Sequence, residues 1–394
     1  MISAADLAEL LAELEPIGRS EGGTTRLAWT AEDEAAGAWF ARTATGSGLR
    51  TERDPAGNLW ALPEGGGPFW AVGSHLDSVR EGGRYDGALG VVAGFAIARR
   101  SHVPLAVIAF ADEEGARYNT PTFGSRALVG RLDLNDVLNR VDEHGVSLQD
   151  AMRGAGVDPD QLDTAPGWVE RLRGLVELHI DQSREVAELA VAAGVVRGLA
   201  ARMRVEVDLR GVADHAGTTR RTDRSDALLA AARLIVRADE LATPAMVATA
   251  GRILVEPNAA TTVASHVRLW LDARAPGPGE LDAWWERVKA AAHELQAASR
   301  VEVGLSVASL NRGATFDEEV RAALGAAAGK EGLSTPEIVC FAGHDAGVIA
   351  QRRPAGMVLV RNATGVSHAP SEYVELEDAA AAARVVQAAL EALA

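Results

Sequence analysis

Four short apolar runs lie along the chain, and each is followed by polar residues. The runs cover 69–73, 105–111, 175–178 and 357–360. Runs of four to eight apolar residues bounded by turns are typical of buried strands in an α/β sheet. Residues 86–99 have helical composition between the first two runs, which predicts a βαβ unit. Because parallel strands end at one sheet edge, we expect the polar residues that follow them to meet there.

A different pattern begins near residue 200. Alternating or apolar segments predict strands at 203–209, 246–255, 267–273 and 301–307, and longer periodic segments predict helices at 223–238 and 280–299. This β-α-β-β-α-β order matches the ferredoxin-like arrangement. We therefore predict a small α+β domain, residues 200–308, inserted in a larger α/β domain made of residues 1–199 and 309–394. The glycine-containing connections at 194–198 and 311–313 are expected to act as hinges.

Composition narrows the possible functions. The 394 residues include 39 Lys and Arg against 55 Asp and Glu, a net charge of −16. This excess argues against partners that are bound through phosphate charge, namely nucleic acids and anionic membranes. The single cysteine, Cys340, excludes an intramolecular disulfide and a thiolate zinc site. No apolar run reaches about 18 residues and residues 1–15 lack a basic stretch, so we expect a cytoplasmic protein without membrane segments.

Histidines and carboxylates recur where strands are predicted to end. The segments are His75-Leu76-Asp77, Asp86 among glycines 82, 83 and 87, Glu113-Glu114, Glu177-Leu178-His179 and Ser367-His368. A ligand histidine commonly donates its second ring N–H to a carboxylate, and the alternation of a strand allows Asp77 to serve His75. Each segment alone has a structural explanation, such as a turn or a solvated face. Five of them at strand ends predict a metal site.

These segments also match a known family in order. The segments 73–77, 82–87, 112–115, 177–179, 215–219, 343–346 and 367–370 resemble the dinuclear zinc amidohydrolases. That family includes N-carbamoyl-L-amino acid hydrolases, allantoate amidohydrolases and β-ureidopropionases, which are related to aminoacylases and carboxypeptidase-type metallopeptidases. The resemblance covers nearly the whole chain. It implies a metallopeptidase-like catalytic domain with an inserted ferredoxin-like lid that also forms a homodimer.

The resemblance also implies roles for individual residues. One divalent ion would be held by His75, His179 and Asp86, and a second by the same Asp86 with Glu114 and His368. Zinc is the family default, although such a donor set also accepts Mn, Co or Ni. Glu113 would be the general base that acts on a metal-activated water.

The remaining implied residues concern the substrate, a small-molecule carboxylate. His215 would donate to the developing oxyanion, in cis or from the dimer partner. Arg274 would hold the substrate carboxylate. Further expected substrate contacts are Gln182, Thr261 and His344.

The sequence departs from the family pattern around the substrate. Ser183 stands where the family usually has glycine, Arg220 and Arg221 replace a Pro-Met pair, and Thr261 replaces an asparagine. Phe341 lies in a segment that is usually Ser-Gly-Ala. The reaction class is therefore better determined than the substrate. An aminoacylase or dipeptidase and a non-catalytic metal-binding homologue are the alternatives, and retention of Glu113 speaks against the second.

Overall fold

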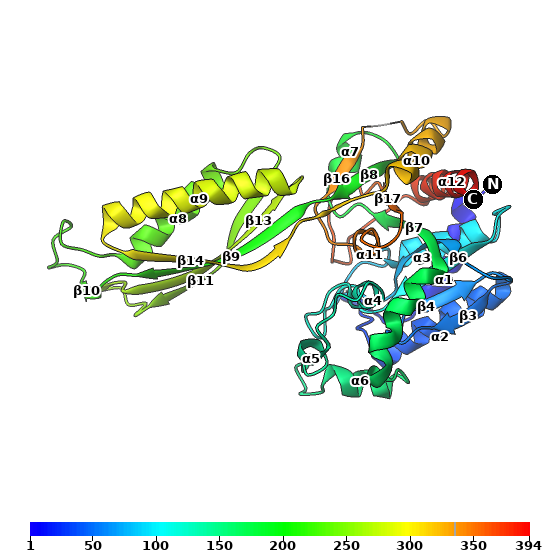
Figure 1. Ribbon diagram of the computed structural model, residues 1–394, viewed down its shortest axis with the longest axis horizontal. Helices are drawn as coiled ribbons and strands as arrows, with labels where there is room; N and C mark the ends of the chain where they lie inside the picture. Colours follow the sequence, from blue (N-terminus) through cyan, green and yellow to red (C-terminus); the bar gives the residue numbers. More distant parts are fainter. Residues whose placement is uncertain (335) are drawn as a thin grey trace. The chain divides into compact units, whose positions relative to one another are not determined.

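The structure is a computed structural model that describes residues 1–334 and 336–394. Within them the chain forms two compact units (Figure 1). The first unit comprises Met1–Gly198 and Thr315–Ala394, and the second comprises Leu199–Ala314. The first is a mixed α/β unit and the second an α+β insertion, which confirms the predicted fold class.

The first unit is built on a mixed sheet with strand order β15-β8-β17-β7-β5-β6-β4-β3, to which β16 adds by pairing with β8. The strands are β3 (Arg50–Arg53), β4 (Leu59–Leu62), β5 (Phe69–His75), β6 (Leu105–Phe110), β7 (Leu172–Ile180), β8 (Ala193–Leu199), β15 (Ala314–Thr315), β16 (Ile338–Cys340) and β17 (Ala355–Val360). The four predicted apolar runs are β5, β6, β7 and β17, and neighbours among these strands pair in parallel. Their carboxyl ends therefore share one edge.

Helices and short elements cover this sheet. They are α1 (Ala4–Leu14), β1 (Arg19–Ser20), β2 (Gly23–Thr24), α2 (Ala31–Gly46), α3 (Ala88–Ala98), α4 (Phe123–Leu128), α5 (Leu134–Val137), α6 (Leu148–Gly154), η1 (Pro159–Arg171), α7 (Glu185–Glu188), α10 (Glu318–Lys330), α11 (Asp345–Ile349) and α12 (Leu376–Leu393). The predicted βαβ unit is confirmed as β5-α3-β6. Residues 88–97 of α3 are all buried, since α3 packs between the sheet and helices α1 and α12. This packing fixes the start of α3, where Asp86 lies.

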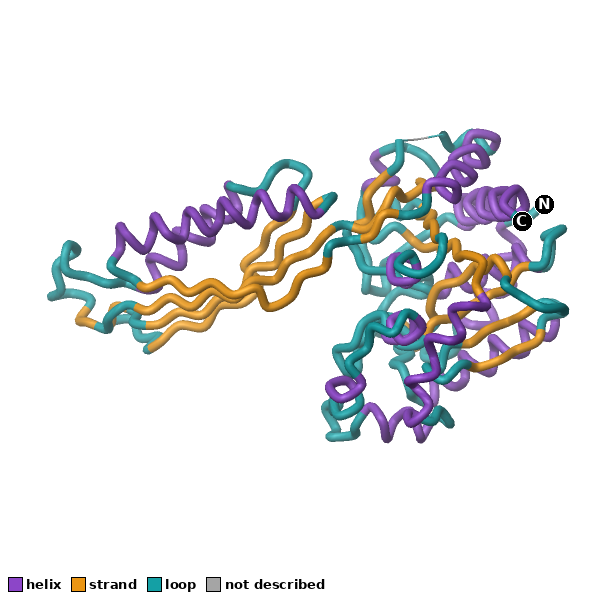
Figure 2. The backbone as a smooth tube through the Cα atoms, in the orientation of Figure 1, coloured by secondary structure: helices purple, strands orange, loops and turns teal. Residues whose placement is uncertain are grey.

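The second unit is a four-stranded antiparallel sheet with two helices (Figure 2). Its elements are β9 (Ala201–Arg210), β10 (Asp214–His215), α8 (Ala227–Glu240), β11 (Val247–Glu256), β12 (Thr262–Val263), β13 (His266–Ala275), α9 (Pro278–Ser299) and β14 (Glu302–Asn311). The strand order β11-β13-β9-β14 is that of the predicted ferredoxin-like fold. Along β13 the odd-numbered residues are buried with the helices in one core, and the even-numbered residues lie on the opposite face.

One local expectation was wrong. The helix predicted from Asp223 begins at Ala227, because the side chain of Asp226 accepts from the backbone N–H groups of Leu228 and Leu229 and so caps it. Residues 194–198 form part of β8, which pairs with β17 and ends at the boundary between the two units, so that a hinge at this connection stays a prediction. Within residues 1–334 and 336–394, no helix is both long and apolar enough to cross a membrane.

Candidate metal centre

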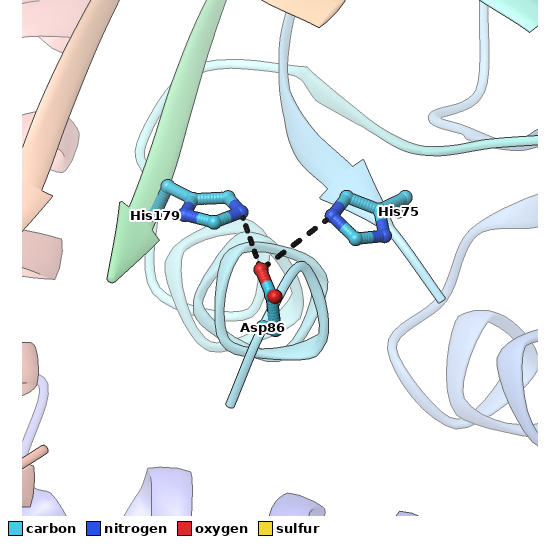
Figure 3. Close-up of side chains that lie close together, drawn as sticks. All are labelled: His75, Asp86 and His179. Carbon is cyan, nitrogen blue, oxygen red and sulfur yellow. Dashed lines mark ion pairs between the residues drawn. The ribbon is translucent and has the colours of Figure 1, made fainter. Parts of the chain in front are cut away.

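Asp86 lies between two histidines that come from neighbouring strands (Figure 3). His75 ends β5 and His179 is the penultimate residue of β7, and both rings point toward the Asp86 carboxylate. The Oδ1 atom of Asp86 lies 3.2 Å from Nε2 of His179 and 4.0 Å from Nε2 of His75. Gly87 follows with φ of +64°, and a Cβ there would lie 2.4 Å from the His75 ring. Glycine at this position therefore allows the close approach.

Both histidines are oriented by backbone carbonyls. Nδ1 of His75 lies 2.9 Å from the carbonyl oxygen of Asp77, and Nδ1 of His179 lies 2.8 Å from that of Ile180. A carbonyl only accepts, so each Nδ1 carries the proton. Each Nε2 is then left as the atom that can bind a cation near Asp86.

The other oxygen of Asp86 faces a second group of ligands. Oδ2 of Asp86 lies 3.5 Å from Nε2 of His368, which lies 3.6 Å from Oε2 of Glu114. The amide nitrogen of Gln182 approaches the same ring nitrogen at 3.3 Å and both Asp86 oxygens at 3.4 and 3.5 Å. The donor atoms of Asp86, Glu114 and His368 lie within 4.8 Å of one another, as do those of His75, Asp86 and His179. Asp86 is thus common to both groups.

Asp77 acts on the backbone of the two glutamates. Its Oδ1 accepts from the N–H of Glu113 at 3.1 Å, and its Oδ2 from the N–H of Glu114 at 3.0 Å. The carboxylate–histidine contact expected with His75 is therefore replaced, because both carboxylate oxygens hold this turn and the nearer one is 3.6 Å from Nδ1. Oε2 of Glu113 lies 3.8 Å from Nε2 of His75, which places this carboxylate beside the first ligand group.

The electrostatics of the cluster fit a cation. Burial, together with the Asp86 and Asp77 charges, raises the pKa of Glu114 to about 9. Burial and the neighbouring Asp345 and Glu114 raise the pKa of Glu113 well above its ordinary value. Oε1 of Glu114 is buried without a hydrogen-bond partner among the described residues. Buried carboxylates with so little compensating positive charge are typical of metal sites, and this donor set of imidazoles and carboxylates fits divalent ions.

His215 lies in β10 of the second unit and is exposed. Its Nδ1 accepts hydrogen bonds from the backbone N–H groups of Gly217 at 3.0 Å and Thr218 at 3.1 Å. In the neutral ring the proton is therefore on Nε2, which can donate to an anion. Thr261 is close to this loop, since its carbonyl oxygen accepts from the N–H of Ala216.

Arg274 lies at the other end of the same sheet. It pairs in register with Arg202 at the start of β9, and its Nε donates to Asp272 at 3.1 Å. His266, at the beginning of β13, pairs with Arg210 on the side of β10 and β12. Eight residues of strand at about 3.3 Å each separate the two positions, or roughly 26 Å. Within one second unit, His215 and Arg274 are therefore too far apart to touch one small molecule.

His344, which the sequence suggested as a substrate contact, is buried. Only 2 % of the residue is exposed, its ring centre lies 4.4 Å from that of His179, and its Nδ1 lies 4.0 Å from Oε1 of Glu177. Neither ring nitrogen has a hydrogen-bond partner in the described part of the chain. Burial and the neighbouring His179 lower its pKa well below the ordinary value, so the ring is neutral.

Comparison with known proteins identifies the family. Residues 61–392 match the family model described as peptidase family M20/M25/M40. The chain belongs to this family. It is 36% identical over 401 residues to an N-carbamoyl-L-amino acid amidohydrolase of Geobacillus stearothermophilus, covering 98% of this chain and 97% of that one. It is 31% identical to an allantoate amidohydrolase of Bacillus subtilis (strain 168), covering 94% and 92%.

A solved structure places the chain more narrowly within the M20 family. A hydantoinase/carbamoylase family amidase from Burkholderia ambifaria superimposes with a TM-score of 0.88 at 29% identity, covering 99% of this chain and 97% of that chain. The chain is thus an M20 hydrolase of the hydantoinase/carbamoylase type. Its buried His, Asp and Glu clusters are consistent with the metal site typical of the M20 family.

Sequence analysis missed Arg26, a buried residue behind the M20 metal cluster. Its Nε donates to the carbonyl oxygen of Leu76 at 2.7 Å, and its backbone N–H and carbonyl pair with Ser78. Burial lowers its pKa to about 10, a change that the nearby Asp77 opposes. Arg26 therefore fixes the chain on both sides of Asp77. The only sequence signal for it was an arginine directly before the apolar stretch 27–29.

Glu177 was noted with its segment but given no role. It is fully buried and accepts from the Ser74 hydroxyl and from the N–H of Ala346, both at 2.8 Å. It therefore connects β7 to β5 and to the start of α11.

Ser183, which stands where the family usually has glycine, also has a structural role. Asp181 accepts from the Ser183 N–H and hydroxyl and from the N–H of Val186, which closes the turn into α7.

Proposed function

We propose that this protein is a metal-dependent amidohydrolase that cleaves a C–N bond of an N-carbamoyl (ureido) amino acid or a related ureido acid. The observation that carries the proposal is the position of Asp86. One of its oxygens faces His75 and His179, and the other faces His368. With Glu114 as the fifth ligand, this arrangement suits two divalent ions that share one carboxylate, with zinc as the expected metal.

Glu113 is suited to the role of general base. Bound divalent ions would lower the pKa of a water and polarise the carbonyl of the ureido group. Glu113 lies beside the ligands, and its backbone is held by Asp77. Its carboxylate would accept the proton of the attacking water and deliver it to the leaving nitrogen as the first C–N bond breaks. The carbamate that remains would then break its own C–N bond and lose carbon dioxide, so that the products are ammonia, carbon dioxide and the amino acid.

The substrate would be anchored by residues of the second unit. Arg274 offers a guanidinium for the substrate carboxylate, and His215 offers its Nε2–H for the developing oxyanion. Gln182 and Thr261 are further candidate contacts. His344 is buried beside His179, so it would contact only a substrate group that enters the cluster. The separation of roughly 26 Å along one sheet favours His215 and Arg274 acting on the same substrate from different subunits.

This arrangement requires a homodimer, which we propose forms through the second unit. Strand β11 is an edge of its sheet. The large apolar side chains exposed on β11 and on the neighbouring helix α8 are Leu228, Leu229, Val236, Val247, Ile253 and Leu254. An exposed edge strand with apolar neighbours is a surface on which a second copy can add its own strand.

Ammonia release tests the reaction. Purified protein loaded with zinc, manganese, cobalt or nickel should release ammonia from at least one of a set of ureido acids that includes N-carbamoyl amino acids, allantoate, ureidoglycolate and β-ureidopropionate. A chelator should abolish the release and added metal should restore it, because the water is activated only when the ions are bound. Release of a carboxylic acid or a second amino acid from N-acyl substrates alone would instead identify an aminoacylase or dipeptidase. Absence of all these activities would refute the proposal.

His215→Ala should lower turnover by about a hundredfold or more without loss of metal, because one oxyanion donor is removed. Elemental analysis checks the metal content. If His215 acts across the dimer, mixing His215→Ala subunits with Glu113→Gln subunits under exchange conditions should restore activity, since a mixed dimer has one intact site. Unchanged turnover in the single variant would contradict the oxyanion role, and absence of restoration would contradict action in trans.

A further inference from the structure

His368 is the least enclosed of the five assigned ligands. Of its side chain 48 % is exposed, whereas the side chains of His75 and His179 are buried. Its backbone φ is +55°, a conformation that is unfavourable for a residue with a Cβ atom. Within the described residues, no backbone carbonyl orients its ring in the way that those of Asp77 and Ile180 orient the other two. The position of His368 therefore depends on how its loop is held.

Glu372 lies in this loop and bonds to both neighbours of His368. Only 3 % of the residue is exposed. Its Oε1 accepts from the hydroxyl of Ser367 at 3.1 Å, and its backbone N–H donates to the carbonyl oxygen of Ala369 at 3.0 Å. Because Ser367 and Ala369 are adjacent to His368, these two bonds hold the chain on either side of the ligand.

The other carboxylate oxygen of Glu372 lies against the loop that carries Asp86. A Cβ at Gly83 would lie 2.1 Å from Oε2 of Glu372, so that glycine is needed for this approach. The next residue, Tyr373, packs edge-on against Tyr85, with ring centres 6.3 Å apart. The loop around Glu372 is therefore packed against the loop of Asp86 at two neighbouring points.

Glu372 is also a buried carboxylate without a paired cation. In the part of the chain that the structure describes it forms no ion pair, and its Oε2 has no hydrogen-bond partner. Burial of a carboxylate with so little compensation destabilises a fold. A contribution to stability therefore does not account for this residue, whereas its contacts with the two ligand loops do.

We infer that Glu372 is a positioning residue for one of the two ions, because it holds His368 in place opposite Asp86. Nε2 of His368 lies 3.5 Å from Oδ2 of Asp86, and the contacts of Glu372 keep the two loops in register at this point. The inference rests on the proposed function, in which Asp86, Glu114 and His368 bind the second ion. Replacing a residue that orients a metal ligand commonly lowers metal affinity by about tenfold to a hundredfold.

Calorimetric titration of the metal-free protein with zinc tests the inference. Glu372→Ala should bind one ion as tightly as the wild type, because His75 and His179 are oriented by their own carbonyl partners. It should bind the other ion at least about tenfold more weakly. Glu372→Gln removes the same charge but keeps the shape and an oxygen that can accept from Ser367. This matched variant should bind both ions nearly as the wild type does.

A double-mutant cycle with His368→Ala identifies the ion that is affected. In a protein that already carries His368→Ala, adding Glu372→Ala should leave the affinity of the remaining ion unchanged, since a residue that acts through His368 then has nothing to position. Ser367→Ala is a milder change at a half-buried position and should weaken the same ion by a smaller factor.

Each contrary result overturns the inference in a different way. Wild-type affinity for both ions in Glu372→Ala would remove the positioning role. Equal weakening in the alanine and glutamine variants would assign the effect to charge, and equal weakening of both ions would assign it to general loosening. If Glu372→Ala does not fold, unchanged zinc binding in Ser367→Ala overturns the inference instead. In all these cases two ions in the wild type and ammonia release still uphold the proposed function, whereas a wild type that binds at most one ion refutes the two-ion site and the inference together.

Discussion

Asp86→Ala is expected to leave the protein with one bound metal ion or none in place of two, and to lower turnover by at least about a thousandfold. Asp86 is the one carboxylate that belongs to both ligand groups, with His179 on Oδ1 and His368 on Oδ2. Removing it takes a ligand from each ion at once. Bound ions stabilise the transition state by several kcal/mol, and each 1.36 kcal/mol that is lost lowers the rate about tenfold. Elemental analysis of the dialysed protein and ammonia-release kinetics are the measurements.

A capping variant separates this effect from general destabilisation. Asp226→Ala removes the N-cap of α8 and should lower the free energy of unfolding by about 1 kcal/mol. Because Asp226 lies outside the metal cluster, this variant should keep two ions. Asp86→Ala should lose metal and still remain folded by circular dichroism, because the start of α3 is held by the packing of this helix between the sheet and helices α1 and α12. Two ions retained in Asp86→Ala would contradict the shared-ligand assignment.

The sequence predicted the elements whose patterns are locally strong. Each of the four central strands of the first sheet contains a continuous apolar run, and the alternation along β13 follows from one buried face, so both patterns were visible without any knowledge of their partners. No helix or strand is predicted from sequence for residues 112–171, because their short helices α4, α5 and α6 depend on packing around Trp29 and Phe123. The start of α8 was misplaced for a related reason, since periodicity does not reveal which of several acids is the cap.

The candidate site was predictable as a set of residues but only partly as a set of contacts. Parallel strands bring His75 and His179 to one edge, and this follows from topology alone. Asp77 is the residue that faces Nδ1 of His75, as predicted, but it accepts through its backbone carbonyl at 2.9 Å, whereas its carboxylate lies 3.6 Å away. Arg26 is distant in sequence from the residues it supports, so that only the folded chain reveals its contact with Leu76.

Glu113→Gln is expected to retain both metal ions and to lower turnover by about a hundredfold to ten-thousandfold, the range typical for loss of a general base. Glutamine preserves the shape of the side chain and leaves the backbone N–H that donates to Asp77. It removes only the capacity to accept a proton from water. The pertinent measurements are the metal content, kcat for ammonia release, and the ability to bind substrate without turnover.

Glu114→Gln is the matched control, since the two glutamates are adjacent and their N–H groups are both bound to Asp77. Oε2 of Glu114 faces His368, and Glu114 is one of the five assigned ligands. Oε2 of Glu113 faces His75, but Glu113 is not an assigned ligand. Glu114→Gln should therefore lose metal together with activity, and excess metal in the assay should recover part of its turnover. Glu113→Gln should lose activity alone, with no recovery on adding metal. If Glu113→Gln turned over like the wild type, or if the two variants lost metal equally, Glu113 would not be the base and would have to be counted among the ligands.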